Sequence, residues 1–167
     1  AVMVDVRWPE GAQSVAARAR AAGIPVVLDG EMGNVGLLRA MVPLADHVIF
    51  SEPGWAEWLG QPGEVADAHD AEHELQRLVA AGAVLAAVTL GERGLLYATR
   101  GSDGMRHLPA FEVAAVETLG AGDAFHGAYA LAVAEGMAIQ EALRFAAATA
   151  ALRCSRSGGR LALPTRA

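Results

Sequence analysis

The sequence predicts an α/β protein in which a mostly parallel sheet carries helices on both faces. In the first half of the 167-residue chain, short apolar runs alternate with amphipathic segments that end at glycine. This alternation is typical of β–α–β units. After residue 83, three strand-like runs follow one another through short glycine-containing links, which indicates an antiparallel meander at one edge of the sheet.

The elements of the first half follow from apolar periodicity and from their stop signals. Helical segments end at Gly23, Gly60 and Gly82, and the last of them has its acids in the first turns, as the helix dipole favours. The crossovers between parallel strands should be right-handed. Expected strands cover residues 2–6, 24–30, 46–51 and 83–91, and expected helices cover 11–23, 34–45, 54–60 and 67–82.

The second half is expected to hold two further strands, at 94–100 and 105–111, joined by the turn "GSDG". Two consecutive helices, 124–135 and 139–153, follow with no strand between them, and the tail reads as a loop. The opening run "AVMVDV" already has the character of a buried strand without a polar lead-in. It therefore predicts that residues are missing upstream.

Composition excludes several function classes. With 37 alanines and 19 glycines, the interior must bring backbones close together, and the net charge is −6. The chain has no lysine, which excludes a Walker A loop and a Schiff-base lysine. Its scattered arginines favour neither nucleic acid nor a membrane as partner. Cys154 is the single cysteine, so no internal disulfide can form. A single cytoplasmic domain is expected.

The segment "ETLGAGDAFHGAYALAVAEG" carries the strongest chemical signal. The backbone amides of Gly120, Ala121 and Gly122 should converge at the start of a helix and form an anion site. Asp123 in the same turn would accept a proton from an alcohol during phosphoryl transfer. The alternative is an ordinary turn with Asp123 as its N-cap. A dinucleotide fingerprint is disfavoured, because two helices follow the loop where that motif needs a strand.

"ETLGAGDAFHGAYA" resembles the D-T-x-G-A-G-D-x-F signature of the ribokinase-like (PfkB) family of carbohydrate kinases. "VTLGERG", "EALRFAAATAALRC", "GGRLALPT" and "ADHVIFSEPGWAEWLG" resemble other family segments, in family order. Among family members, the segments "TLGAGD" and "QEALRF" are most similar to those of ketohexokinase-like sugar kinases. The resemblance spans residues 1–167 as the C-terminal portion of one kinase domain. It implies a three-layer ribokinase-like fold whose N-terminal part, with the G-G-N sugar loop and the β lid, is absent from this sequence.

The resemblance implies a site for ATP, Mg²⁺ and a sugar. Asp123 would be the catalytic base, and the anion hole would comprise Gly120, Ala121 and Gly122. The residues implied to bind ATP are Thr89, Gly91, Gly94, Ala147 and Cys154.

Two departures from the family pattern concern metal ions. Glu117 replaces the aspartate that helps to bind a monovalent cation in many members, which leaves potassium activation open. "SEPG" (51–54) replaces an N-x-x-E motif that holds magnesium through water, and Ser51 and Gly54 cannot do that. No residue is expected to bind the metal directly. Compensating carboxylates at the strand ends would be Asp5, Asp29 and Glu31. Arg7 would contact substrate or phosphate, or else lie exposed on the rim.

Other signals are discounted. His69 and His73 are spaced like a metal pair but lie in an acidic segment that favours a solvated helix face. His126 is expected in helix packing or at the cleft edge, and Trp55 and Trp58 in packing.

We therefore expect an ATP-dependent sugar kinase whose partners are a small sugar and the missing N-terminal half, with a homodimer left open. The alternatives are a non-catalytic nucleotide- or sugar-binding module of the same fold, and a kinase for a nucleoside or vitamin alcohol.

Overall fold

A six-stranded sheet forms the centre of the computed structural model, which describes residues 1–60 and 68–165, without the side chains of residues 68 and 69. Its strands lie side by side in chain order. The first four pair in parallel and the last two join antiparallel, as the sequence predicts. The strands are β1 (Val2–Val4), β2 (Val26–Gly30), β3 (His47–Ser51), β4 (Leu85–Thr89), β5 (Leu95–Thr99) and β6 (Arg106–Leu108).

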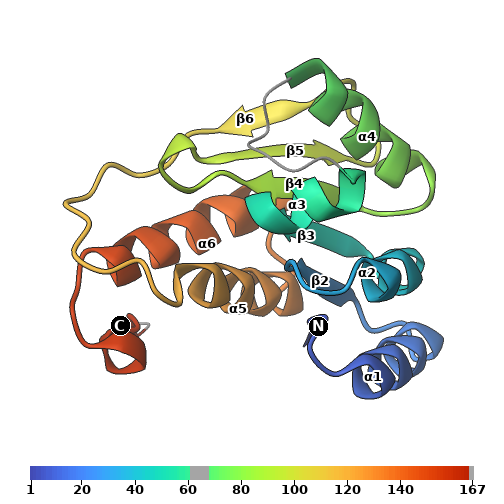
Figure 1. Ribbon diagram of the computed structural model, residues 1–167, viewed down its shortest axis with the longest axis horizontal. Coiled ribbons are helices and arrows are strands. Elements are labelled where there is room, and N and C mark those ends of the chain that lie inside the picture. Colours follow the sequence, from blue (N-terminus) through green and yellow to red (C-terminus); the bar gives the residue numbers. More distant parts are fainter. Residues whose placement is uncertain (61–67, 166–167) are drawn as a thin grey trace.

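Helices cover the sheet on both faces, which gives the three layers that the resemblance implies (Figure 1). Right-handed crossovers between parallel strands in sequential order place every connecting helix on one face. This layer comprises α1 (Pro9–Ala21), α2 (Val35–Met41), α3 (Glu52–Leu59) and α4 (Ala68–Ala80). The opposite layer comprises α5 (Ala121–Ala134) and α6 (Ile139–Cys154), which run against each other. Three short 3₁₀ segments are η1 (Val42–Leu44), η2 (Gly91–Arg93) and η3 (Gly159–Ala162).

The two hydrophobic cores follow from strand alternation, because successive side chains of a strand point to opposite faces. In β2, Leu28 belongs to the core under α1–α4, whereas its neighbour Val27 belongs to the core under α5 and α6. Both are completely buried. Fully buried alanines, among them Ala132 of α5 and Ala146 of α6, line the second core, so the alanine-rich composition allows these helices to approach closely.

Several boundaries differ from the sequence-based expectation. α1 starts at Pro9, two residues early, because proline suits the first helical turn. β1 ends at Val4 rather than residue 6, and β6 spans only three residues. The tail contains the 3₁₀ turn η3 instead of a plain loop. α5 begins at Ala121, three residues before the expected start, which moves Asp123 into its first turn. Residue 67, the expected start of α4, lies outside the described residues.

Over the described part of the chain, no helix combines the length and the apolar character needed to cross a membrane.

Candidate active site

The loop before α5 turns sharply into the helix at Gly120. This residue is the N-cap and has φ +78°, a left-handed conformation that glycine adopts without strain. In the described part of the chain, the amide nitrogens of Gly120 and Gly122 have no hydrogen-bond acceptor. The amide of Ala121 differs from the expectation, since it donates to the Thr118 carbonyl oxygen at 3.1 Å. Two of the three expected amides are therefore free to bind an anion at the positive end of α5.

Asp123 lies in the first turn of α5 with an exposed side chain. Because Gly120 occupies the N-cap position and no side chain caps the helix, the interpretation of Asp123 as an N-cap is wrong. A carboxylate in this place is stabilised by the helix dipole and remains accessible to a substrate.

A second carboxylate, Asp29 at the end of β2, is buried beside His126 of α5. The Asp29 Oδ1 and His126 Nε2 atoms lie 3.5 Å apart, and Oδ1 has no hydrogen-bond partner in the described residues. Burial raises the pKa of Asp29 to about 6. The negative charges of Glu31, Asp123 and Asp5 act in the same direction, whereas His126 lowers the pKa. These four acids lie on or just after β1 and β2 and in the first turn of α5, three elements that contact one another.

His126 joins three elements. Its Nδ1 lies 2.9 Å from the Gly122 carbonyl oxygen, and its Nε2 lies 3.3 Å from the carbonyl oxygen of Ile49 in β3. The side chain is only 1% exposed, so His126 lies in helix packing, as the sequence indicates. It holds the first turn of α5 against the ends of β2 and β3.

A cavity of about 630 Å³ opens between η2, the loop before α5, and α6. Its volume is in the range of small-molecule sites. Gly91 (φ +59°) has nothing within 4 Å of the position of a Cβ atom, which leaves its backbone open to a ligand. All five residues expected to bind ATP line this cavity, together with two of the anion-hole residues: Thr89, Gly91, Gly94, Ala147, Cys154, Ala121 and Gly122.

The residues that replace the N-x-x-E motif have a structural role. Ser51 caps α3, its Oγ accepting a hydrogen bond from the Gly54 amide at 3.1 Å. A Cβ atom at Gly54 would lie 1.8 Å from the Gly30 carbonyl oxygen. The first turn of α3 therefore rests directly on the backbone of β2, and no side chain fits at position 54. Glu52, the remaining acid of the segment, pairs with Arg93 at 2.5 Å.

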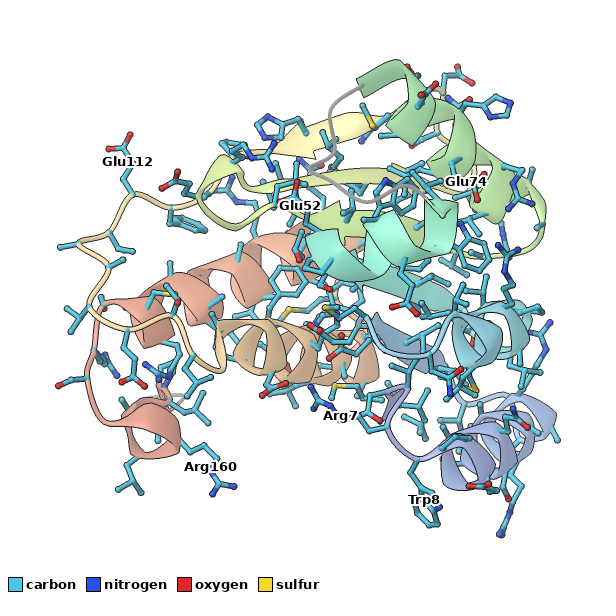
Figure 2. All side chains as sticks on the ribbon, in the orientation of Figure 1. Arg7, Trp8, Glu52, Glu74, Glu112 and Arg160 are labelled. Atoms are coloured by element: carbon cyan, nitrogen blue, oxygen red, sulfur yellow. The ribbon has the colours of Figure 1, made fainter. Side chains whose placement is uncertain are left out.

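The rim residues differ in exposure. Asp5 accepts a hydrogen bond from the Arg7 amide at 3.0 Å, and its Oδ2 lies 3.8 Å from the Arg7 guanidinium. The Arg7 side chain is 69% exposed and extends from the loop after β1, next to Trp8 (Figure 2). Arg7 therefore lies exposed on the rim, and Glu31 is half-buried.

The remaining discounted residues fall into packing or onto the surface. Trp55 and Trp58 lie against Phe50 with ring centroids 5.3 and 5.7 Å apart, which confirms their packing role. His73 is exposed on α4, while the side chain of His69 lies outside the described residues. Within residues 1–60 and 68–165, no three potential ligands are grouped to hold a metal ion.

Sequence reasoning missed Arg153, a buried charge on α6. Its side chain is 1% exposed and lies 2.9 Å from Glu117 Oε1. Its Nη1 donates to the carbonyl oxygens of Arg156 at 2.9 Å and Glu117 at 3.5 Å. The only signal in the sequence is an arginine on an otherwise small and apolar face of the helix.

Comparison with known proteins identifies the family to which these features belong. The family model described as "pfkB family carbohydrate kinase" matches residues 1–166. The chain belongs to the pfkB family of carbohydrate kinases. A ribokinase from Haemophilus influenzae is 30% identical over 156 residues, which cover 93% of this chain and 49% of that protein.

Solved structures of pfkB relatives agree with the fold. A crystal structure from Agrobacterium tumefaciens, provisionally described as a ribokinase, superimposes with a TM-score of 0.88 at 39% identity, covering 99% of this chain and 52% of the other. The structure of Arabidopsis thaliana ribokinase complexed with ribose and ATP superimposes with a TM-score of 0.84 at 27% identity. The match covers 98% of this chain and 52% of the other. The chain spans about half the length of these relatives. Most of the similar proteins are named ribokinases. The expected closer similarity to ketohexokinase-like sugar kinases is therefore not supported.

One further similar structure contains a monovalent cation. Vibrio cholerae fructokinase, in its fructose-, ADP- and potassium-bound form, gives a TM-score of 0.73 at 26% identity, covering 90% of this chain and 51% of that one.

Proposed function

We propose that this chain is the nucleotide-binding and catalytic portion of an ATP-dependent sugar kinase. The observation that carries the proposal is the cavity that brings together Gly91, Ala147 and Cys154 with Gly122 at the start of α5. These residues come from η2, α6 and α5, and the free amides at the start of α5 lie where an anion is favoured. The ribose and ATP of the Arabidopsis relative support a sugar and ATP as ligands.

The chemistry assigned to the chain's own residues is simple. The amides of Gly120 and Gly122 hold the transferring phosphoryl group, and the apolar wall of the cavity excludes water from the nucleotide. Asp123, exposed beside these amides, orients the sugar hydroxyl and accepts its proton as the oxygen attacks the γ-phosphorus. Asp29 and His126 keep the first turn of α5 in place.

The carboxylates at the ends of β1 and β2 would hold Mg²⁺ through water, because the described residues contain no group of three direct metal ligands. The buried Asp29 Oδ1 lacks a hydrogen-bond partner in the described residues. Burial raises the pKa of Asp29, and the negative charges of Glu31, Asp123 and Asp5 add to this effect. Mg²⁺ usually retains water and phosphate ligands beside one or two carboxylates, so Asp29 and Glu31 would hold it through water. The ion would neutralise charge on the nucleotide phosphates.

A non-catalytic nucleotide-binding module is the second candidate. The contact between Gly54 and the Gly30 carbonyl favours it, because that contact leaves no room for a carboxylate at position 54.

Nucleotide binding by the chain tests the proposal. Isothermal titration with ATP–Mg²⁺, ADP and adenosine should show binding that depends on the phosphates. The variant Gly122→Asp places a carboxylate among the amides, where a Cβ meets nothing within 4 Å. We expect it to fold normally and to weaken ATP binding by at least about tenfold, through charge repulsion.

The matched control is Gly127→Asp in the same helix, where a Cβ also meets nothing within 4 Å. It adds the same charge away from the cavity and should bind ATP as the wild type does. Equal affinities for adenosine and ATP would contradict the phosphate site. An equal loss of ATP affinity in Gly122→Asp and Gly127→Asp would contradict it as well.

A further inference from the structure

We infer that Arg153 is a built-in cation of this kinase, which takes the place of a bound monovalent ion beside the loop that enters α5. The inference rests on the proposed nucleotide site and concerns its support. Arg153 is a positioning residue and not a catalytic one, because it touches the Glu117 segment and not the cavity that would hold ATP.

Three oxygen atoms surround the Arg153 guanidinium. They are Oε1 of Glu117 at 2.9 Å, the carbonyl oxygen of Arg156 at 2.9 Å and the carbonyl oxygen of Glu117 at 3.5 Å. Carboxylate and carbonyl oxygens are the ligands that hard cations prefer. The place therefore has the donor set of a cation site, and a guanidinium fills it.

Glu117 is fully engaged in this arrangement. Its Oε2 accepts hydrogen bonds from the amides of Gly158 at 3.1 Å and Gly159 at 3.3 Å. Together with Arg153, these amides draw the segment before η3 toward the loop that precedes α5. In addition, the amides of Val116 and Glu117 both donate to the Cys154 carbonyl oxygen, at 2.8 and 3.1 Å. The end of α6 thus fixes the backbone three residues before Gly120.

A second cation does not fit here. The side chain of Arg153 is 1% exposed, and a buried charge of this kind is retained only with its partners. A potassium ion would have to share the same oxygens and would be repelled by the guanidinium at close range. The potassium of the Vibrio fructokinase structure therefore has no counterpart in the donor set around Glu117.

The test compares potassium chloride with choline chloride at equal ionic strength. The melting temperature of the wild-type protein should differ by less than about 1 °C between the two salts, and its affinity for ADP by less than about twofold. The variant Arg153→Ser leaves the oxygens without a cation, so potassium should raise its melting temperature by about 3–5 °C over choline, in a saturable way. Arg160→Ser removes an arginine that extends from η3 away from the fold (Figure 2) and should behave as the wild type does.

Saturable stabilisation of the wild-type protein by potassium would overturn the inference, and this measurement decides even where Arg153→Ser does not fold. A folded Arg153→Ser that responds to potassium no more than the wild type would also overturn it. If no salt allows ADP to bind, the proposed nucleotide function fails, whereas the melting comparison without nucleotide still decides the role of Arg153.

Discussion

Asp123 and Asp29 lie near each other but have opposite environments. Asp123 is exposed in the first turn of α5, whereas Asp29 is 3% exposed at the end of β2. The exposed carboxylate is accessible to a substrate, whereas burial raises the pKa of the Asp29 carboxyl. Chemistry at this site is therefore set by burial as much as by residue type.

Replacing Asp123 by asparagine tests the proposed base in the longer kinase of which we propose this chain is a portion. The asparagine side chain keeps the size of the original one but cannot accept the alcohol proton. We expect kcat to fall by about 10²–10⁴-fold with little change in ATP affinity, because backbone amides bind the phosphates. Steady-state kinetics measure this. A variant that retained more than a tenth of the wild-type kcat would show that Asp123 is not the base.

The raised pKa of Asp29 makes stability depend on pH. In the folded protein this pKa is about 6, against an ordinary 3.8. The folded state therefore holds the proton more tightly, so Asp29 contributes stability fully below about pH 4 and loses that contribution as the pH rises through 6. In the wild type, this decline in the free energy of unfolding amounts to roughly 1–3 kcal/mol. The Asp29→Asn variant should not show it.

Urea unfolding between pH 4.5 and 8 measures this difference. Asp103→Asn, at an exposed aspartate, serves as the control and should retain the wild-type profile. If the free energy of unfolding changed with pH in the same way for Asp29→Asn and the wild type, the raised pKa of Asp29 would be contradicted.

At the scale of elements, the packing of α3 on β2 explains why the chain lacks an acid at position 54. The helix begins one residue after β3 ends, so its first turn passes directly over the Gly30 carbonyl. Only glycine allows this approach, because a Cβ would overlap the oxygen.

Gly54→Ala should destabilise the protein by about 1–3 kcal/mol, since the backbone of α3 or β2 must shift. Gly127→Ala in α5, where a Cβ meets nothing within 4 Å, should instead be neutral or stabilising by up to about 1 kcal/mol. Chemical denaturation of the two variants measures both effects. Equal stabilities would mean that the α3–β2 contact is not tight.

At the scale of the whole molecule, the 167 residues span about half of the pfkB relatives. A sugar kinase must exclude water from the transferring phosphoryl group. We expect this chain to bind nucleotide but to phosphorylate sugars weakly or not at all when it is alone.

A coupled assay of ADP release with ribose and fructose, on this chain and on the longer protein of which we propose it is a portion, tests this expectation. Activity should appear only in the longer protein. Full sugar kinase activity of the 167-residue chain by itself would contradict the prediction, and weak hydrolysis of ATP without sugar would agree with it.

The sequence by itself determined the local features of this protein. Apolar periodicity and glycine stops predict the order of strands and helices and the antiparallel meander, because these depend on neighbouring residues. The "GAGD" segment predicts the start of a helix that can bind an anion. The expected start of α5 was three residues late, because the left-handed Gly120 ends the loop before Ala121. The five residues assigned to ATP by resemblance all line one cavity.

Only the tertiary structure decided which distant groups meet. Glu117 and Arg153 are 36 residues apart, yet they form an ion pair in which the arginine is buried. The raised pKa of Asp29 and the contact of Gly54 with Gly30 likewise depend on packing between separate elements. Charge, burial and close approach are properties of the assembled layers and not of any local segment, because they depend on what lies on the other side of each side chain.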